Sequence, residues 1–224
     1  MSIQENIKQY TEELGKENCR LCAVSKTKPA EDIAEAYEAG QRIFGENKAQ
    51  EMASKYEELP KDIEWHMIGH LQRNKVKYIA PFVSLIHSVD SERLLKEINK
   101  QGEKADRVIP CLLQVHIAEE ESKFGLDRDE VMALLQPEIL GEMPHIEIRG
   151  LMGMATNTDD DARVRKEFAS LKSLFDTVKQ GFDSERITMK ELSMGMSGDY
   201  RVAMAEGSTL VRIGSAIFGA RNYT

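Results

Sequence analysis

Apolar residues along the chain form short, nearly continuous runs that alternate with segments of helical periodicity. An amphipathic helix is predicted over residues 2–15, because apolar side chains recur there at helical spacing: Ile3, Ile7, Tyr10 and Leu14. The run Arg20–Ser25 follows and has no polar alternation. Such a run is typical of a strand buried on both faces of a parallel sheet.

The same alternation continues along the chain. Further helices are predicted over residues 30–39, 47–58, 72–79, 91–101, 128–135, 160–180 and 199–206, with Pro137 closing the helix at 128–135. Strands are marked by eight residues: Leu21, Ile43, Trp65, Leu85, Leu113, Ile148, Leu192 and Val211. Eight βα units fit a (β/α)8 TIM barrel of the α/β class better than a doubly wound sheet, which usually stops at about five or six strands. No linker divides the chain, so we expect a single domain, with the barrel over about residues 20–219.

Composition and charge narrow the protein class. With 224 residues, 41% of them hydrophobic, the chain can bury one sizeable core, and no apolar run approaches the roughly 18–20 residues that span a bilayer. The first residues lack a signal-peptide pattern, so we expect a cytoplasmic protein with its three cysteines reduced. A net charge of −8 disfavours nucleic acid as a partner.

Lys26 is the first candidate for chemistry. It directly follows the first apolar run, at the carboxyl end of the predicted strand, where barrel enzymes place their active-site groups. An apolar barrel mouth should lower the pKa of its amine and free that amine for Schiff-base formation. The alternative is a strand-end lysine that extends into solvent.

Glycines and one arginine point to the same end of the barrel. Five of the 15 glycines lie in the last 30 residues, and hydroxyls accompany them at Ser197 and Ser215, after the last two strands. These loops often bind phosphate in barrels, although ordinary turns also use such residues. Arg212 lies between Val211 and Ile213, so alternation directs it into the barrel, to face an acid, an anion or a ligand ring nitrogen.

Three further patterns carry less weight. Cys19 and Cys22 have the spacing of a redox or metal pair, but Cys22 falls inside a predicted strand and there is no second pair. His66 and His70 lack the intervening glutamate of a helical zinc motif, so no metal site is predicted. The segment Met194–Gly198 matches a serine-hydrolase nucleophile elbow only in part.

Several motifs together carry a resemblance to a known family. They are Ala23–Pro29 (AVSKTKP), Phe44–Asn47 (FGEN), Trp65–Gly69 (WHMIG), Ile86–Asp90 (IHSVD), Gly150–Met154 (GLMGM), Leu192–Ser197 (LSMGMS) and Gly207–Gly219 (GSTLVRIGSAIFG). On these motifs the chain resembles the YggS/PROSC family of pyridoxal phosphate homeostasis proteins. The match runs from the first strand to the last in the expected order.

The resemblance implies a barrel like the N-terminal domain of alanine racemase, with pyridoxal 5′-phosphate (PLP) bound as a Schiff base. It implies roles for seven residues: Lys26 as the Schiff-base lysine, Ser197, Gly214 and Ser215 at the phosphate, Arg212 at the pyridine nitrogen, and Asn47 and His66 near the cofactor. Two positions depart from the common pattern. Lys48 stands where many relatives have tyrosine, which removes an aromatic contact, and Ser215 stands where threonine is frequent.

The resemblance and the charge of Arg212 together favour a carrier over an enzyme. A permanently protonated arginine beside the pyridine nitrogen weakens the cofactor as an electron sink. Alanine racemase tolerates this arrangement but takes its second base, a tyrosine, from another domain, for which 224 residues leave no room; Tyr200 and Tyr223 are equally well interpreted as surface residues.

We therefore expect a non-enzymatic protein of vitamin B6 homeostasis, without catalytic residues of its own, that acts as a monomer and passes PLP to PLP-dependent apo-enzymes. The alternatives are a small PLP-dependent amino-acid racemase and a barrel that binds partners without a cofactor.

Overall fold

Eight parallel strands close into a barrel in the computed structural model, which describes residues 2–118, 124–182 and 184–219. The strands are β1 (Arg20–Val24), β2 (Ile43–Glu46), β3 (Glu64–Met67), β4 (Leu85–Val89), β5 (Ile109–Val115), β6 (Ile146–Gly153), β7 (Ile187–Met196) and β8 (Leu210–Ile213). Each strand pairs with the next, and β1 closes the barrel on β8 with Cys22 beside Arg212. All eight strand markers lie in these strands, which confirms the predicted (β/α)8 barrel.

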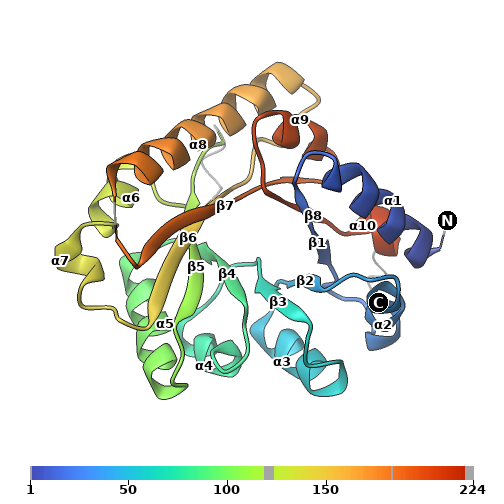
Figure 1. Cartoon of the computed structure of the whole chain (residues 1–224), viewed down its shortest axis with the longest axis horizontal. Helices are drawn as coiled ribbons and strands as arrows, with labels where there is room; N and C mark the ends of the chain where they lie inside the picture. Colours follow the sequence, from blue (N-terminus) through green and yellow to red (C-terminus); the bar gives the residue numbers. More distant parts are fainter. Residues whose placement is uncertain (1, 119–123, 183, 220–224) are drawn as a thin grey trace.

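Helices surround the strands on the outside of the barrel (Figure 1). They are α1 (Ile3–Gly15), α2 (Ala30–Glu38), α3 (Ala49–Glu58), the 3-10 helix η1 (Arg73–Lys75), α4 (Val76–Ile79), α5 (Glu92–Lys104), α6 (Arg128–Leu134), α7 (Pro137–Leu140), α8 (Asp161–Gly181), α9 (Tyr200–Ala205) and α10 (Ser215–Phe218). None of the described helices is both long and apolar enough to cross a bilayer.

The extra N-terminal helix is confirmed as α1. Ser2 caps it, because its hydroxyl accepts from the backbone N–H of Glu5 while the Glu5 carboxylate accepts from the backbone N–H of Ser2. The Asn6 side-chain amide donates to the Ile217 carbonyl at 3.0 Å. This hydrogen bond joins α1 to α10, the helix that follows the last strand (Figure 1).

Pro137 has a different role from the one predicted. Helix α6 already ends at Leu134, and Pro137 begins the short helix α7. The physical reason is that proline lacks a backbone N–H and has a fixed φ, so it suits the first turn of a helix as well as the region after one.

Strand alternation divides the core into two parts. The smaller part consists of buried side chains from six strands: Cys22, Ile43, Leu85, Leu112, Met152 and Leu210. Val211 and Ile213 belong to the larger part, which includes the helix side chains. Leu210 and Arg212 therefore face the barrel interior while Val211 and Ile213 face the helices, which confirms the inward direction predicted for Arg212.

Candidate functional site

A cavity of about 310 Å³ lies at the carboxyl ends of the strands. Six residues expected from the sequence line it: Lys26, Asn47, Ser197, Arg212, Gly214 and Ser215. The other lining residues are Val24, Ile68, Met154, Met196 and Gly198. Most of these residues follow or end a strand, so the closure of the barrel alone brings them together from distant parts of the sequence.

Lys26 reaches this cavity from the turn that follows β1. Ser25 is still paired with the sheet, because its backbone N–H donates to the Gly45 carbonyl at 3.0 Å. Lys26 itself is partly buried, and Thr27 beyond it is exposed. The lysine thus stands between the buried strand and solvent, as its position after the apolar run predicted.

Small residues form the side of the cavity contributed by the loops after β7 and β8. Gly214 is closely approached by its neighbour, since a Cβ there would lie 3.0 Å from the Val24 carbonyl oxygen. Gly198 is not, because a Cβ there would meet no protein atom within 4 Å. The space beside Gly198, together with the hydroxyls of Ser197 and Ser215, leaves room for a polar group of a ligand.

Arg212 is a buried cation at the base of the cavity, 5% exposed. It donates to Ser193 Oγ at 2.5 Å and to the Gly153 carbonyl at 3.1 Å. Burial lowers its pKa from the usual value, but an arginine stays protonated in proteins. The sequence left open a carboxylate partner for this arginine, and the two acceptors found here are neutral.

The hydrogen-bond chain continues through two histidines. His87 Nδ1 lies 3.0 Å from Ser193 Oγ, and His87 Nε2 lies 2.9 Å from His66 Nδ1. Burial lowers the pKa of His66 to about 3 and that of His87 well below its usual value, so both rings are neutral near pH 7. Within the described lining His66 does not appear, and the hydrogen bonds through His87 and Ser193 connect it to Arg212.

His87 and Ser193 were not assigned a role from the sequence. A signal for them existed, because His87 stands two residues after the inward-facing Leu85, as Arg212 does after Leu210. Alternation therefore directs both His87 and Arg212 into the barrel. It does not say that β4 and β7, which are separated by two strands, place His87 opposite Ser193.

Tyr200 is not a surface residue, contrary to the interpretation from the sequence. It is 7% exposed, its hydroxyl lies 3.1 Å from both carboxylate oxygens of Glu13, and its ring packs edge-on against Tyr10. Helix α1 covers this tyrosine, and the sequence of α9 alone does not reveal that packing. Tyr223 lies outside the described residues.

The cysteines are buried free thiols. Burial raises the pKa of Cys19 to about 11 and that of Cys22 to about 12, which makes these thiols unreactive near pH 7. Over residues 2–118, 124–182 and 184–219, no group of three or more His, Cys, Asp or Glu side chains is placed to hold a metal ion.

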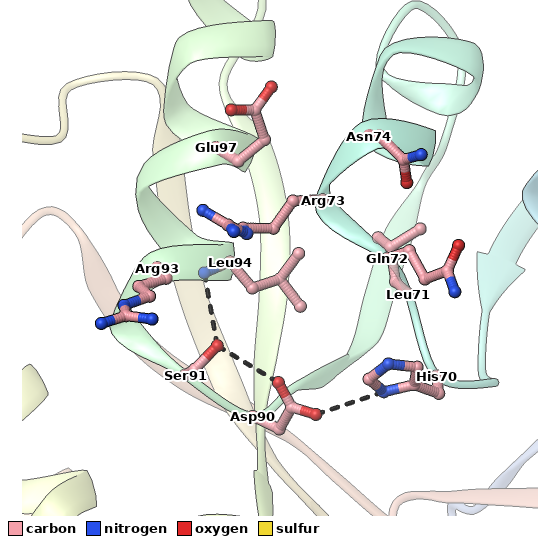
Figure 2. Close-up of a pocket in the computed structure, with 10 residues that line it drawn as sticks. All are labelled: His70, Leu71, Gln72, Arg73, Asn74, Asp90, Ser91, Arg93, Leu94 and Glu97. Carbon is pink, nitrogen blue, oxygen red and sulfur yellow. Dashed lines mark hydrogen bonds and ion pairs between the residues drawn. The ribbon is translucent and has the colours of Figure 1, made fainter.

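A second pocket, of about 650 Å³, lies between η1 and the start of α5 (Figure 2). His70 Nδ1 lies 3.4 Å from Asp90 Oδ2 there, and Ser91 caps α5 by accepting from the Leu94 backbone N–H. Figure 2 shows Arg73 and Glu97 farther along the pocket, on η1 and α5. The pocket holds none of the seven predicted site residues, so the smaller cavity is the candidate functional site.

Comparisons with known proteins show the family to which the chain belongs. The family profile described as the alanine racemase N-terminal domain matches residues 1–222. The pyridoxal phosphate homeostasis protein of Aquifex aeolicus is 40% identical, over 99% of this chain and 96% of its own length. The protein of the same name from Pasteurella multocida is 39% identical, again over 99% and 96%.

Solved structures give the same relationship. PipY of Synechococcus elongatus superposes with a TM-score of 0.89 without PLP and 0.87 with PLP bound, at 36% identity, over 97% of this chain and all of PipY. Alanine racemase of Bartonella henselae has a TM-score of 0.72 at 19% identity, over 99% of this chain and 60% of the racemase, which shows a shared fold.

Proposed function

The chain belongs to the family of pyridoxal phosphate homeostasis proteins, and we propose that it holds PLP as a Schiff base on Lys26 and carries or buffers the cofactor without catalysing a reaction on it. One observation carries the proposal: Lys26 and Arg212 line the same cavity, beside the small and hydroxyl-bearing residues of the last two strand ends.

The residues of this cavity fit PLP. When bound, the cofactor would supply an aldehyde, the group with which a lysine amine forms a Schiff base and releases water. Lys26 would provide the amine. The phosphate would be held by hydroxyl and backbone N–H donors of Ser197, Gly214 and Ser215. Arg212 would face the pyridine nitrogen, and Asn47 would lie near the cofactor ring.

The lining also explains why we propose a carrier. Lys26 and Arg212 are the ionisable side chains among the described lining residues. Racemisation needs a proton donor and a proton acceptor on opposite faces of the substrate carbon, and arginine serves poorly as either. Tyr200, whose hydroxyl contacts Glu13 on α1, is placed away from this lining.

Three finer points belong to the same proposal. We infer that the protein acts as a monomer, because Lys26, Arg212 and the small residues of the last two strand ends already meet within one barrel. We further infer PLP-dependent apo-enzymes as recipients, since the cavity lies at the barrel mouth, where a bound cofactor would be accessible from outside. A cytoplasmic location is part of the same proposal.

The proposal is tested by titrating the protein with PLP, recording visible spectra before and after borohydride reduction, and mapping the reduced adduct by peptide mass spectrometry. We expect a single adduct on Lys26 that is absent in Lys26→Ala. Adducts scattered over surface lysines such as Lys8 and Lys100 would overturn the site. Turnover of either alanine enantiomer that disappears in Lys26→Ala would establish the racemase instead.

A further inference from the structure

The turn that carries Lys26 has an unusual backbone. Residues 25–28 form a tight turn closed by a hydrogen bond from the Lys28 N–H to the Ser25 carbonyl at 3.0 Å. Thr27 occupies the third position with a φ of +64°. That left-handed conformation normally requires glycine or asparagine, and it is strained for a β-branched residue. The surrounding structure must therefore hold the turn in place.

Three side chains outside the turn contact the polar groups on both sides of Lys26. Glu51 Oε1 accepts from the Thr27 backbone N–H at 2.6 Å, and Lys55 Nζ donates to the Ser25 carbonyl at 2.9 Å. Glu46 Oε1 accepts from the Ser25 hydroxyl at 2.6 Å. Each contact fixes a residue next to Lys26 in the sequence.

These three side chains are also joined to one another. Lys55 Nζ lies 2.8 Å from Glu46 Oε1 and 2.8 Å from Glu51 Oε1. Glu51 and Lys55 are four residues apart on α3, so both project from the same face of the helix. Glu46 ends β2, and the network thus ties the turn to a strand and a helix at once.

The network is costly to bury. The Glu46 side chain is fully buried, and the Lys55 side chain is 9% exposed. A buried ion pair seldom adds net stability compared with apolar residues of similar size, because both charges lose their hydration. Burial also raises the pKa of Glu46 above its usual value. A role in positioning accounts for the network better than a contribution to stability does.

We propose that Glu46, Glu51 and Lys55 form a clamp of positioning residues that holds the strained Ser25–Lys28 turn and so directs Lys26 into the cavity. The proposal rests on Lys26 being the Schiff-base lysine. The hydrogen bonds by which Glu46, Glu51 and Lys55 reach the turn are made to Ser25 and Thr27, whereas Lys28 Nζ donates separately to the Phe218 carbonyl after β8 at 2.7 Å. We therefore expect the clamp to control how fast Lys26 reacts with the cofactor aldehyde and to leave non-covalent retention of the phosphate unchanged.

The test uses Glu51→Ala, with Glu57→Ala as a matched control on the exposed side of the same helix. The Glu51 side chain is 23% exposed, so we expect Glu51→Ala to fold, and a melting curve checks this. With PLP, we expect the Lys26 adduct to form about tenfold more slowly in Glu51→Ala, as release of a strained backbone of this kind predicts, and at the wild-type rate in Glu57→Ala.

Two further measurements separate positioning from a general structural effect. Thr27→Gly in the Glu51→Ala background should restore the rate, because glycine adopts a φ of +64° without strain. In the Lys26→Ala background, equilibrium dialysis should give the same PLP affinity with and without Glu51→Ala.

Equal adduct rates in Glu51→Ala and Glu57→Ala overturn the clamp, and so does a slow rate that Thr27→Gly leaves uncorrected. Hydrogen exchange of the Lys28 amide reports turn opening without any cofactor and should accelerate in Glu51→Ala alone. If the wild type forms no adduct on Lys26 but Lys28 amide exchange is faster in Glu51→Ala than in the wild type, the turn is clamped and the proposed function fails. If Glu51→Ala does not change the exchange rate, the clamp fails.

Discussion

The guanidinium of Arg212 donates to Ser193 Oγ at 2.5 Å, inside the barrel and at the base of the cavity that Lys26 also lines. Ser193 in turn contacts His87, which contacts His66. The positive charge of Arg212 is therefore held by neutral hydrogen-bond acceptors. This arrangement keeps the full charge of the arginine available to the cavity, whereas a carboxylate partner would compensate it.

Ser193→Ala should lower the free energy of unfolding by about 1–3 kcal/mol, because a buried donor of Arg212 and a nitrogen of His87 lose their partner. Urea denaturation at pH 7 measures this. Ser173→Ala, at an exposed position of α8, is the control and should change stability by less than about 0.5 kcal/mol. Equal effects of the two substitutions would show that the hydrogen bonds of Ser193 to Arg212 and His87 contribute nothing to the stability of the protein.

The two barrel histidines predict a loss of stability in acid. The pKa of His66 is about 3 in the folded protein against 6.5 as its ordinary value, and that of His87 is also lowered, in both cases mainly by burial. Between pH 6.5 and 3 the unfolded chain binds more protons, so the free energy of unfolding falls as the pH falls, by up to about 1.4 kcal/mol per pH unit for each histidine.

The measurement is urea denaturation of the wild type and of His66→Gln between pH 4.5 and 7.5. The raised pKa of Glu46 acts in the opposite direction above pH 4.5, but it contributes equally to both proteins and cancels in their difference. We expect a shallower pH dependence in His66→Gln. Parallel curves would contradict a buried, neutral His66.

Gly198→Ala should weaken PLP binding about tenfold without lowering the melting temperature, because the added methyl group meets no protein atom but stands beside the cavity. Gly181→Ala, at the end of α8, also meets no atom and lies away from the cavity, so it should leave the affinity unchanged. Isothermal titration compares the two. Tight binding by Gly198→Ala would place the phosphate elsewhere.

Gly150→Ala should prevent the barrel from closing. Its φ is +157°, and a Cβ there would overlap the Glu191 carbonyl oxygen on the neighbouring strand β7. We expect a loss of more than about 3 kcal/mol and insoluble expression. Gly40→Ala, with a φ of +99° and no atom within 4 Å, is the comparison and should cost only about 1 kcal/mol, measured by urea denaturation.

The series of strands and helices followed from the sequence because each element carries its own signal. Continuous apolar runs marked β1 to β8, and periodicity marked most helices to within a few residues. The role of Pro137 was predicted wrongly, since proline fits both the end and the beginning of a helix. The short helix α10 was not anticipated, because four residues after β8 are too few to show a period.

The candidate site was also largely predictable. Six of the seven residues expected from the sequence line one cavity, because carboxyl ends of parallel strands share one end of a barrel. Alternation alone directed Arg212 inward. His66 is the exception, since alternation gives the face of a strand but not the depth at which its side chain meets the cavity.

The sequence by itself thus determined the elements, their order and the strand ends that meet. Only the tertiary structure decided which side chains face each other across the barrel and around the Lys26 turn. Lys55 holds the carbonyl of Ser25 from 30 residues away, and His87 meets Ser193 over a separation of 106 residues. Such contacts depend on barrel closure and on register between distant strands, which no local pattern of apolar and polar residues encodes.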